Sequence, residues 1–488
     1  MNLRIRVFPA IVSVATLLAM LPALPAQAAD VDPGFLNPDA SGDIDALALQ
    51  PDGKLLVGGG FDEIGGQIRN RAARLNANGS ADTGFADPNA TYWVTALAAL
   101  PDGKVLVAGA FEDIGAGYTR KHVARLNANG SVDTSFGDPD ASTVVEALAV
   151  QPDGKVFVGG SFITIGGQDR NYVARLNLNG SLDTAFAEAG VDYDVHALAL
   201  QPDGKLFVGG EFSHVAGQPR SGVARLGANG GLDTSFANPA LSDIDGWDAV
   251  VHALALQPDG KLLVAGQFVK VGTQQRTSIA RLNANGSLDA SFLDSAADGF
   301  IDSIALQADG KMFVTGNFSM IGGQARASLA RLNANGSLDT SFPSVDTDGD
   351  VDAMAVQPDG KLLIGGSFES VDGHAFVGLA RLVLSDPAQQ SLDAQGSTFT
   401  WHRSGAVPEL IAPPILYASP NGTSYTAIGP MTRVSGGWQR TSVSLPAGTV
   451  WVRAQGRVGS GANSASSGLI ASRMPAPGGD VIFIDGFE

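Results

Sequence analysis

The fold is decided by residues 196–236, which read HALALQPDGKLFVGGEFSHVAGQPRSGVARLGANGGLDTSF. The alternating pattern of residues 196–200 predicts a first strand. Pro202-Asp203-Gly204 has the residue types that favour a tight turn, and it leads into a second predicted strand over residues 205–208. The stretch therefore begins as a β-hairpin.

Two further strands complete the unit. After a Gly-rich loop, residues 223–226 are predicted to form a third strand, and Asn229-Gly230 turns the chain into a fourth, which ends with residues 232–236. Four strands in a period of about 50 residues are typical of one blade of a β-propeller. A solenoid of stacked repeats is the alternative, and the two ends of the array distinguish them.

The unit occurs seven times. Its P-D-G-K or A-D-G-K lysines stand 50, 51, 50, 56, 50 and 50 residues apart, at Lys54, Lys104, Lys155, Lys205, Lys261, Lys311 and Lys361. The A-R-L arginines keep the same rhythm, at Arg74, Arg125, Arg175, Arg225, Arg281, Arg331 and Arg381. Because residues needed in every blade usually stabilise the blade, we interpret both series as structural rather than as binding rings. Each lysine is expected to cap its turn, and each arginine to pair with the aspartate eight residues later.

The ends of the array favour a closed ring. A D-x-x-F segment follows units one to six, but unit seven lacks it, because Leu392 stands where the phenylalanine is expected. The missing segment, residues 32–35, precedes unit one instead. We therefore predict an all-β fold: a seven-bladed β-propeller over residues 30–384, whose last blade is completed by the N-terminal strand so that no sheet edge is exposed.

At these motifs the sequence resembles the delta-60 repeat family, a bacterial repeat assigned to β-propellers. The elements Q-P-D-G-K, A-R-L-N and L-D-T-S-F carry the resemblance, which covers about residues 31–384. It implies a propeller fold and an exported bacterial protein. It implies no catalytic residues, because the family brings none.

The composition excludes several classes of function. The 488 residues include 31 Lys and Arg against 49 Asp and Glu, a net charge of −18, and no Cys. The lack of Cys excludes thiol catalysis, disulfides and Cys-ligated metal sites, and the acidic balance argues against nucleic acid as a partner.

Residues 1–28 are predicted to be a secretory signal peptide. Arg4 and Arg6 precede an apolar stretch that ends in the small-residue cleavage signature of residues 26–28. No later apolar run is long enough to span a membrane, so no transmembrane segment is expected. The mature protein is expected to be a monomer that is secreted or held in the periplasm or cell envelope.

A candidate binding site is sought where the blades differ. The residue nine positions before each lysine is polar and varies between blades: Asp45, Thr95, Glu146, His196, His252, Asp302 and Asp352. If the innermost strands line the channel, these seven side chains surround one mouth of it. His196 and His252, flanked by Glu146 and Asp302, have the chemistry of a divalent-cation site, and a solvated polar ring is the alternative.

The acidic connecting loops suggest calcium as a second hypothesis. Asp346, Asp348 and Asp350 imitate the start of an EF-hand loop, but Val351 and Gln357 stand where Gly and Glu are required. A calcium loop of another kind remains open, against a merely solvated connection. No cofactor is expected apart from calcium or another divalent cation.

The long loop before blade five is a third candidate. Asp243, Asp245 and Trp247 lie in it, and an exposed tryptophan there would stack on a sugar or a protein partner. Packing of Trp247 against its own loop is the alternative.

A different composition begins after Leu384. Residues 388–473 contain five alternating segments and are predicted to form a small β-sandwich. The elements T-W-H-R-S-G, G-G-W-Q and V-W-V-R-A-Q-G resemble fibronectin type III or immunoglobulin-like modules, and we expect their tryptophans in the core. Residues 459–467 are rich in Gly, Ser, Asn and Ala. Residues 474–488 are predicted to be a linker and a tail, VIFIDGFE, which resembles tails of exported bacterial proteins or forms an edge strand.

The sequence leaves three hypotheses for the function. The first is a non-enzymatic, exported scaffold that binds or displays an unknown protein or carbohydrate partner through its acidic, variable loops. The second is a propeller enzyme, a metal-assisted lyase or hydrolase acting on carbohydrate at His196 and His252. The third is a structural spacer. Only six His and no nucleophile elbow, phosphate loop or H-E-x-x-H motif are present, so we expect no enzyme.

Overall fold

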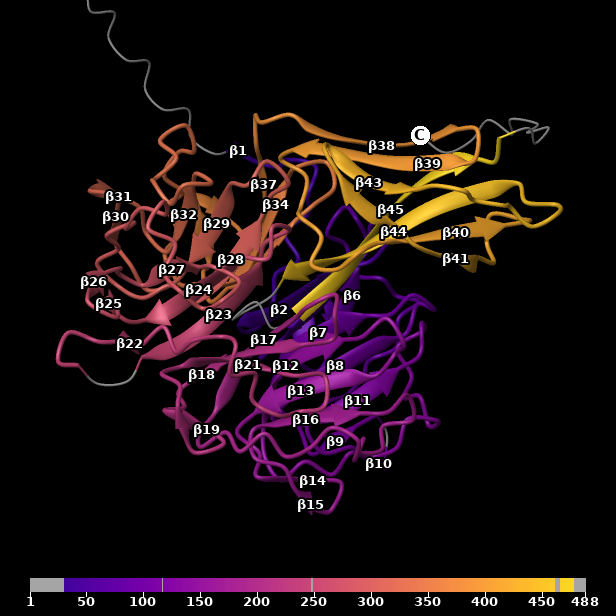
Figure 1. The fold of residues 1–488 in the computed structure, drawn as a ribbon. Coiled ribbons are helices and arrows are strands. Elements are labelled where there is room, and N and C mark those ends of the chain that lie inside the picture. Colours follow the sequence, from indigo (N-terminus) through magenta and orange to yellow (C-terminus); the bar gives the residue numbers. More distant parts are fainter. Residues whose placement is uncertain (1–29, 116, 247–248, 461–465, 478–488) are drawn as a thin grey trace, which may run out of the picture.

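The computed structural model describes residues 30–115, 117–246, 249–460 and 466–477, and within these ranges the chain forms strands and turns but no helix. Seven sheets are arranged around a central channel, and a two-sheet module packs against one end of them (Figure 1). The predicted all-β architecture, a seven-bladed propeller followed by a β-sandwich, is confirmed. In the described ranges no helix is long and apolar enough to cross a membrane.

Each blade contains three long antiparallel strands. The innermost strands are β2 (Ile44–Leu49), β7 (Val94–Ala99), β12 (Val145–Val150), β17 (Val195–Leu200), β23 (Val250–Leu256), β28 (Ser303–Leu306) and β33 (Val351–Val356). The middle strands are β3 (Leu55–Gly59), β8 (Val105–Gly109), β13 (Val156–Gly160), β18 (Leu206–Gly210), β24 (Leu262–Gln267), β29 (Met312–Thr315) and β34 (Leu362–Gly366). The outer strands are β6 (Ala72–Leu75), β11 (Val123–Leu126), β16 (Val173–Leu176), β21 (Val223–Leu226), β27 (Ile279–Leu282), β32 (Leu329–Leu332) and β37 (Leu379–Val383). Neighbouring innermost strands contact one another all the way round, and β33 contacts β2.

A small hairpin joins the middle and outer strands of every blade. These hairpins are β4 (Glu63–Ile64) with β5 (Gln67–Ile68), β9 (Asp113–Ile114) with β10 (Tyr118–Thr119), β14 (Thr164–Ile165) with β15 (Gln168–Asp169), β19 (His214–Val215) with β20 (Gln218–Pro219), β25 (Lys270–Val271) with β26 (Gln274–Gln275), β30 (Met320–Ile321) with β31 (Gln324–Ala325), and β35 (Ser370–Val371) with β36 (His374–Ala375). In blade five, β22 (Leu241–Ser242) pairs with β25.

The prediction of a full fourth strand in each blade is wrong. In blade four only one bridge forms, between Leu226 and Leu232, before the D-x-x-F segment turns. Asp233 causes the turn: its Oδ1 accepts a hydrogen bond from the backbone N of Ser235 at 3.0 Å, and its carbonyl accepts one from Phe236 at 3.2 Å. A side chain that bonds to nearby backbone competes with strand pairing, so the segment becomes a turn that buries its phenylalanine.

The predicted closure of the ring is confirmed. Strand β1 (Asp30–Val31) pairs antiparallel with β37 of the seventh blade. Asp32 follows it, and its Oδ2 lies 2.9 Å from both Arg381 Nε and Lys361 Nζ. The first residues of the described chain thus supply blade seven with the aspartate that its own repeat lacks.

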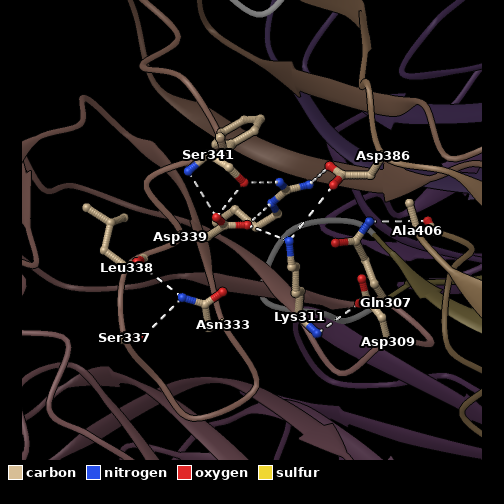
Figure 2. A network of polar contacts seen from close by, with 12 residues as sticks. Gln307, Asp309, Lys311, Asn333, Ser337, Leu338, Asp339, Ser341, Asp386 and Ala406 are labelled. Atoms are coloured by element: carbon tan, nitrogen blue, oxygen red, sulfur yellow. Dashed lines mark hydrogen bonds and ion pairs between the residues drawn. The ribbon is translucent and has the colours of Figure 1, made fainter. Parts of the chain in front are cut away.

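One aspartate with two cations recurs in every blade, and Figure 2 shows the region of this cluster in blade six. In blade three, Asp183 Oδ2 lies 2.7 Å from Arg175 Nε and 2.8 Å from Lys155 Nζ. The seven aspartates are Asp32, Asp82, Asp133, Asp183, Asp233, Asp289 and Asp339. The predicted pairing of the A-R-L arginine is confirmed, and the ammonium group of the repeat lysine binds this same carboxylate in addition.

The same arginine also links neighbouring blades. Arg175 Nη1 donates a hydrogen bond of 2.9 Å to the carbonyl of Ala228, in the Asn-Gly turn of the next blade. Arg381 of the last blade donates one of 2.6 Å to Ala77 of the first, so the series closes on itself. In blade six the acceptor is instead the Asp386 carboxylate, because the seventh unit has no Asn-Gly turn (Figure 2).

The C-terminal module consists of two antiparallel sheets. The first sheet is ordered β38 (Ala388–Gln395), β39 (Thr398–Gly405), β43 (Gly437–Arg440) and β42 (Thr432–Val434), and the second β41 (Thr426–Pro430), β40 (Ile415–Ser419), β44 (Trp451–Ser460) and β45 (Ser466–Pro475). Trp401 and Trp438 are buried in the shared core, as expected, whereas the expectation is wrong for Trp451, which is half-buried with Arg473 Cζ 5.4 Å from its ring centroid. Strand β45 runs to Pro475, two residues into the predicted linker. The tail from residue 478 lies outside the described ranges, as does the predicted signal peptide.

The hairpin of β44 and β45 leaves the module and enters the propeller channel (Figure 1). Ser467 pairs in parallel with Ala98 of the innermost strand β7, so the sheet of blade two continues into the module. Ser466 Oγ accepts a hydrogen bond of 2.9 Å from the backbone N of Leu97. At both ends of the small-residue stretch 459–467, the residues that the structure describes thus belong to a hairpin inside the channel.

Close backbone contact explains the small residues of this hairpin. A Cβ atom on Gly468 would lie 2.6 Å from the backbone N of Leu49, at the end of β2. The module docks at this same end of the propeller, where the backbone N of Glu409 donates to the carbonyl of Leu306 at 2.8 Å. The hairpin therefore enters from the end formed by the Pro-Asp-Gly turns.

We predict that Asp32→Asn opens the ring. The substitution leaves Arg381 and Lys361 without their shared anion, and we expect a loss of about 3 kcal/mol in the free energy of unfolding. The released edge of β37 should promote association that depends on protein concentration. Thermal unfolding with light scattering measures both effects. Asp183→Asn, the equivalent change inside blade three, should lose stability without the scattering, and equal scattering from both variants would contradict the closure.

A cysteine pair, Ala98→Cys with Ser467→Cys, tests the position of the hairpin. The chain has no Cys, so a disulfide formed by mild oxidation reports this contact alone. We expect nearly complete cross-linking by intact-mass analysis and a melting temperature that reductant lowers. The control pair, Ala98→Cys with Ser391→Cys on the exposed side of β38, should stay reduced. Free thiols in the first pair under the same oxidation would place the hairpin outside the channel.

Candidate functional site

The structure places the seven predicted ring residues together at the mouth of the channel that lies opposite the module. In six blades the ring residue is the extra residue of a β-bulge, as Glu146 is between Val145 and Ala147. The bulged residues are Asp45, Thr95, Glu146, His196, His252 and Asp352. Asp302 directly precedes β28, and its backbone N donates to the carbonyl of Thr315 at 2.8 Å. A bulge changes the direction of a side chain, which accounts for polar residues at the start of otherwise apolar strands.

Five ring residues line one open hollow of about 490 Å³: Asp45, Thr95, Glu146, Asp302 and Asp352. Tyr92 and Trp93 form part of its wall, with exposed fractions of 53% and 47% and ring centroids 5.4 Å apart. The hollow therefore combines carboxylates with exposed aromatic surface. Neither Tyr92 nor Trp93 was predicted from the sequence. Trp93 stands two residues before Thr95, so the same comparison between blades would have identified Trp93.

The carboxylates of blades six, seven and one form an arc. Burial raises the pKa of Asp352 to about 7, and the negative charges of Asp45 and Asp350 add to this shift. Burial, with a contribution from Asp350, also raises the pKa of Asp302 to about 7, and burial with Asp43 raises that of Asp45 to about 6. Asp302 and Asp352 are therefore partly protonated near neutral pH, and a bound cation would favour the ionised form of all three carboxyls.

The pKa values of the two ring histidines are shifted in opposite directions. His196 Nδ1 lies 2.5 Å from Glu146 Oε2. Burial lowers the pKa of His196, but the hydrogen bond to Glu146 outweighs burial, so the pKa is raised overall. The His252 ring stacks on His196 with centroids 5.9 Å apart and on Phe300 at 6.0 Å. Burial, helped by the neighbouring His196, lowers the pKa of His252 to about 4. The site thus holds an imidazole whose protonated form is favoured by its bond to a carboxylate, beside an imidazole whose neutral form is favoured.

The described residues contain no group of three or more His, Asp or Glu side chains placed to hold a metal ion. Asp348, one of the three calcium candidates, uses its Oδ1 to accept the backbone N–H groups of Glu369 and Ser370, at 2.8 and 2.9 Å. Asp192 does the same in blade four. Asp346 and Asp350 donate backbone N–H groups to Asp372 and Ser367. The Asp348 carboxylate therefore has a structural role, and the calcium hypothesis stays a prediction.

The loop candidate of blade five lies apart from the ring hollow, whose wall it does not join. The backbone N of Asp245 donates to Asp243 Oδ1 at 2.9 Å, which fixes a local turn. Ile244 between them is 76% exposed. Trp247 lies outside the described residues, so the binding role of this loop stays a prediction.

The closed ring of seven blades defines this chain as a β-propeller protein. A family model described as "Domain of unknown function (DUF5122) beta-propeller" matches residues 50–85, 100–136, 151–186, 201–236, 257–292, 307–342 and 357–382. The matches fall one in each blade, so the chain carries seven DUF5122 repeats. No curated protein matches the sequence.

Several solved structures are similar at low identity. The WD40 propeller domain of Doa1 is 13% identical with a TM-score of 0.42, and 71% of this chain and 94% of that chain are covered. YCF48 bound to D1 peptide is 13% identical with a TM-score of 0.45, covering 73% and 99%. The extracellular domain of the hybrid two-component system BT3049 from B. thetaiotaomicron is 11% identical with a TM-score of 0.40, covering 85% and 56%. Nothing about function follows from these similarities.

Asp302→Asn with Asp352→Asn should stabilise the protein at about pH 8. Both carboxyls have a pKa of about 7 in the folded state, against about 3.9 when unfolded, so the folded state binds more protons between these values. Stability therefore falls as the pH rises from about 4 to 7, and neutral Asn removes this fall. We expect a gain of about 2 kcal/mol at high pH, allowing for partial exposure, and none near pH 4.

Urea unfolding across this pH range measures the effect. Asp169→Asn, an exposed change on β15, is the control and should keep the wild-type slope. A double variant with the same slope as wild type would show that the arc carboxyls titrate normally.

Proposed function

We propose that this protein is an exported, non-enzymatic propeller that binds a partner protein through cationic side chains of that partner, received in the hollow at the channel mouth. The observation that supports this proposal is the shared hollow, in which ring carboxylates from four blades, Asp45, Glu146, Asp302 and Asp352, lie beside Tyr92 and Trp93.

The chemistry of the hollow suits Lys or Arg side chains. A guanidinium or ammonium group gains charge-assisted hydrogen bonds from carboxylates, and its stem packs on an aromatic face. The net charge of −18 would also attract a basic partner over longer distances at low salt. A carbohydrate partner that stacks on Trp93 is the alternative within the same role.

Other parts of the proposal rest on the sequence. The signal-like residues 1–28 support export, with secretion or retention in the envelope, and a monomer is proposed. We also propose that the repeats belong to the delta-60 family. Residues 388–473 are proposed to form a fibronectin type III or immunoglobulin-like module. The two packed sheets of the module favour this assignment of residues 388–473.

An enzyme acting on carbohydrate is the second candidate. It is favoured by His196, paired with Glu146 beside the neutral His252, which is an arrangement suited to proton transfer. His196→Ala with His252→Ala should then abolish turnover at an unchanged melting temperature. Full turnover by a folded double variant would reject these histidines as catalytic.

The binding role is tested with fluorescein-labelled peptides, one rich in Arg and Lys and one of the same length rich in Asp and Glu. Asp45→Asn with Asp352→Asn should weaken binding of the basic peptide about tenfold in fluorescence polarisation, and Trp93→Ala should weaken it as well. The acidic peptide should not bind.

A matched control separates the hollow from net charge. Asp203→Asn with Asp259→Asn changes the charge equally at exposed turns on the module end of the propeller. This variant should bind the basic peptide within about twofold of wild type. Equal weakening by both double variants would mean that only overall charge attracts the peptide, and the proposed site would be wrong.

A further inference from the structure

A second hollow lies inside the channel, on the side that the module hairpin leaves free. Its cavity volume is about 70 Å³. The innermost strands of blades three to six form one wall, through residues such as Leu148, Leu198, Leu254 and Ile304. The hairpin forms the other wall, with Arg457 and Gly459 of β44 and with Ser466 and Ser467 of β45. The hairpin packs mainly against β2 and β7 of blades one and two and more lightly against blades three, six and seven, which leaves the cavity on the side of blades three to six.

Arg457 brings a positive charge to this largely apolar space. Its Nη1 donates hydrogen bonds of 2.9 Å to the carbonyl of Ala99 and to Ser467 Oγ, both of which are neutral. Among the described residues it forms no ion pair, and its Nε and Nη2 have no hydrogen-bond partner. Burial, opposed only by Tyr417, lowers the pKa of Arg457 to about 10.

The nearby carboxylate does not compensate this charge. Glu409 lines the same cavity, but its two oxygens accept hydrogen bonds from Arg433 at 2.7 and 3.0 Å. Arg457 is partly buried, and a cation held away from bulk water without a counter-ion is unfavourable, so proteins normally place an anion beside it. The described side chains provide none for Arg457.

A groove shares part of its lining with this cavity. It has a volume of about 300 Å³ and lies between the Pro-Asp-Gly turns of blades four and five and the module segment 410–413. Leu256, Ile411 and Ala412 line both the groove and the cavity. The two spaces therefore adjoin at these three side chains, and the groove is the entrance that we propose for a small molecule.

We propose that the channel cavity binds a small aliphatic carboxylate, with its anion on Arg457 and its hydrocarbon chain against the leucines of blades three to five. A guanidinium presents paired N–H donors that match a carboxylate, and the apolar wall favours burial of a few methylene groups. This site is separate from the channel mouth and does not depend on the function proposed for it.

The test is isothermal titration of the full-length mature protein with butyrate, together with thermal unfolding in its presence. Butyrate should bind saturably with one site per chain and raise the melting temperature. Butylamine, which carries the opposite charge on the same chain, and chloride at equal ionic strength should do neither. Equal responses to butyrate and butylamine, or to butyrate and chloride, would overturn the proposal.

Two variants separate binding from folding. Arg457→Gln should abolish the butyrate response, whereas Arg453→Gln, on the same strand but packed on Tyr417 and Tyr425, should keep it. Ala255→Leu fills the cavity without touching Arg457, so the folded variant should lose butyrate binding. Binding retained by folded Ala255→Leu would overturn the proposed place, and binding retained by Arg457→Gln would overturn the role of the guanidinium.

Discussion

The structure depends on one ionic cluster, the aspartate that each blade holds between a lysine and an arginine. The cluster has two effects, which the example of Asp32 shows. Asp32 fixes the last turn of blade seven, and its partner Arg381 donates a hydrogen bond to blade one. Burial alone would raise the pKa of these carboxyls, but the hydrogen bonds from Lys54 and Arg74 lower that of Asp82 to about 2. The clusters therefore remain ionised, and hold neighbouring blades in register, at any pH above about 4.

Because the repeated residues hold the blades, the remaining positions can vary. In six of the seven blades the polar ring residue points into the mouth because a bulge interrupts the pairing there, and the bulge leaves the apolar residues on either side buried. This arrangement lets His196, Glu146 and the arc carboxylates lie close together although each comes from a different blade. The charge of the mouth can thus change without any change in the clusters that stabilise the ring.

The repeat rhythm was sufficient to predict the number of blades, the closure by residues 32–35 and the positions of the ring residues, since each is a matter of spacing. The D-x-x-F turns were mistaken for strands because the bond from Asp233 to the backbone of Ser235 depends on three-dimensional geometry. Trp93, by contrast, could have been found from the sequence, because it stands two residues before the ring position Thr95. The hairpin in the channel had no sequence signal beyond small residues, since pairing of Ser467 with Ala98 joins segments far apart in the chain.

The hairpin in the channel also sets an order for folding. Leu97 and Ser466, which are bonded through the serine hydroxyl, are separated by 369 residues. Contacts between such distant segments form slowly, because the chain between them must first become ordered. The residues of β45 are synthesised after all seven blades, whereas the strand they pair with lies in the second blade. The channel must therefore stay accessible from its module end until β44 and β45 have been made, and closure of the channel waits on the insertion of this hairpin.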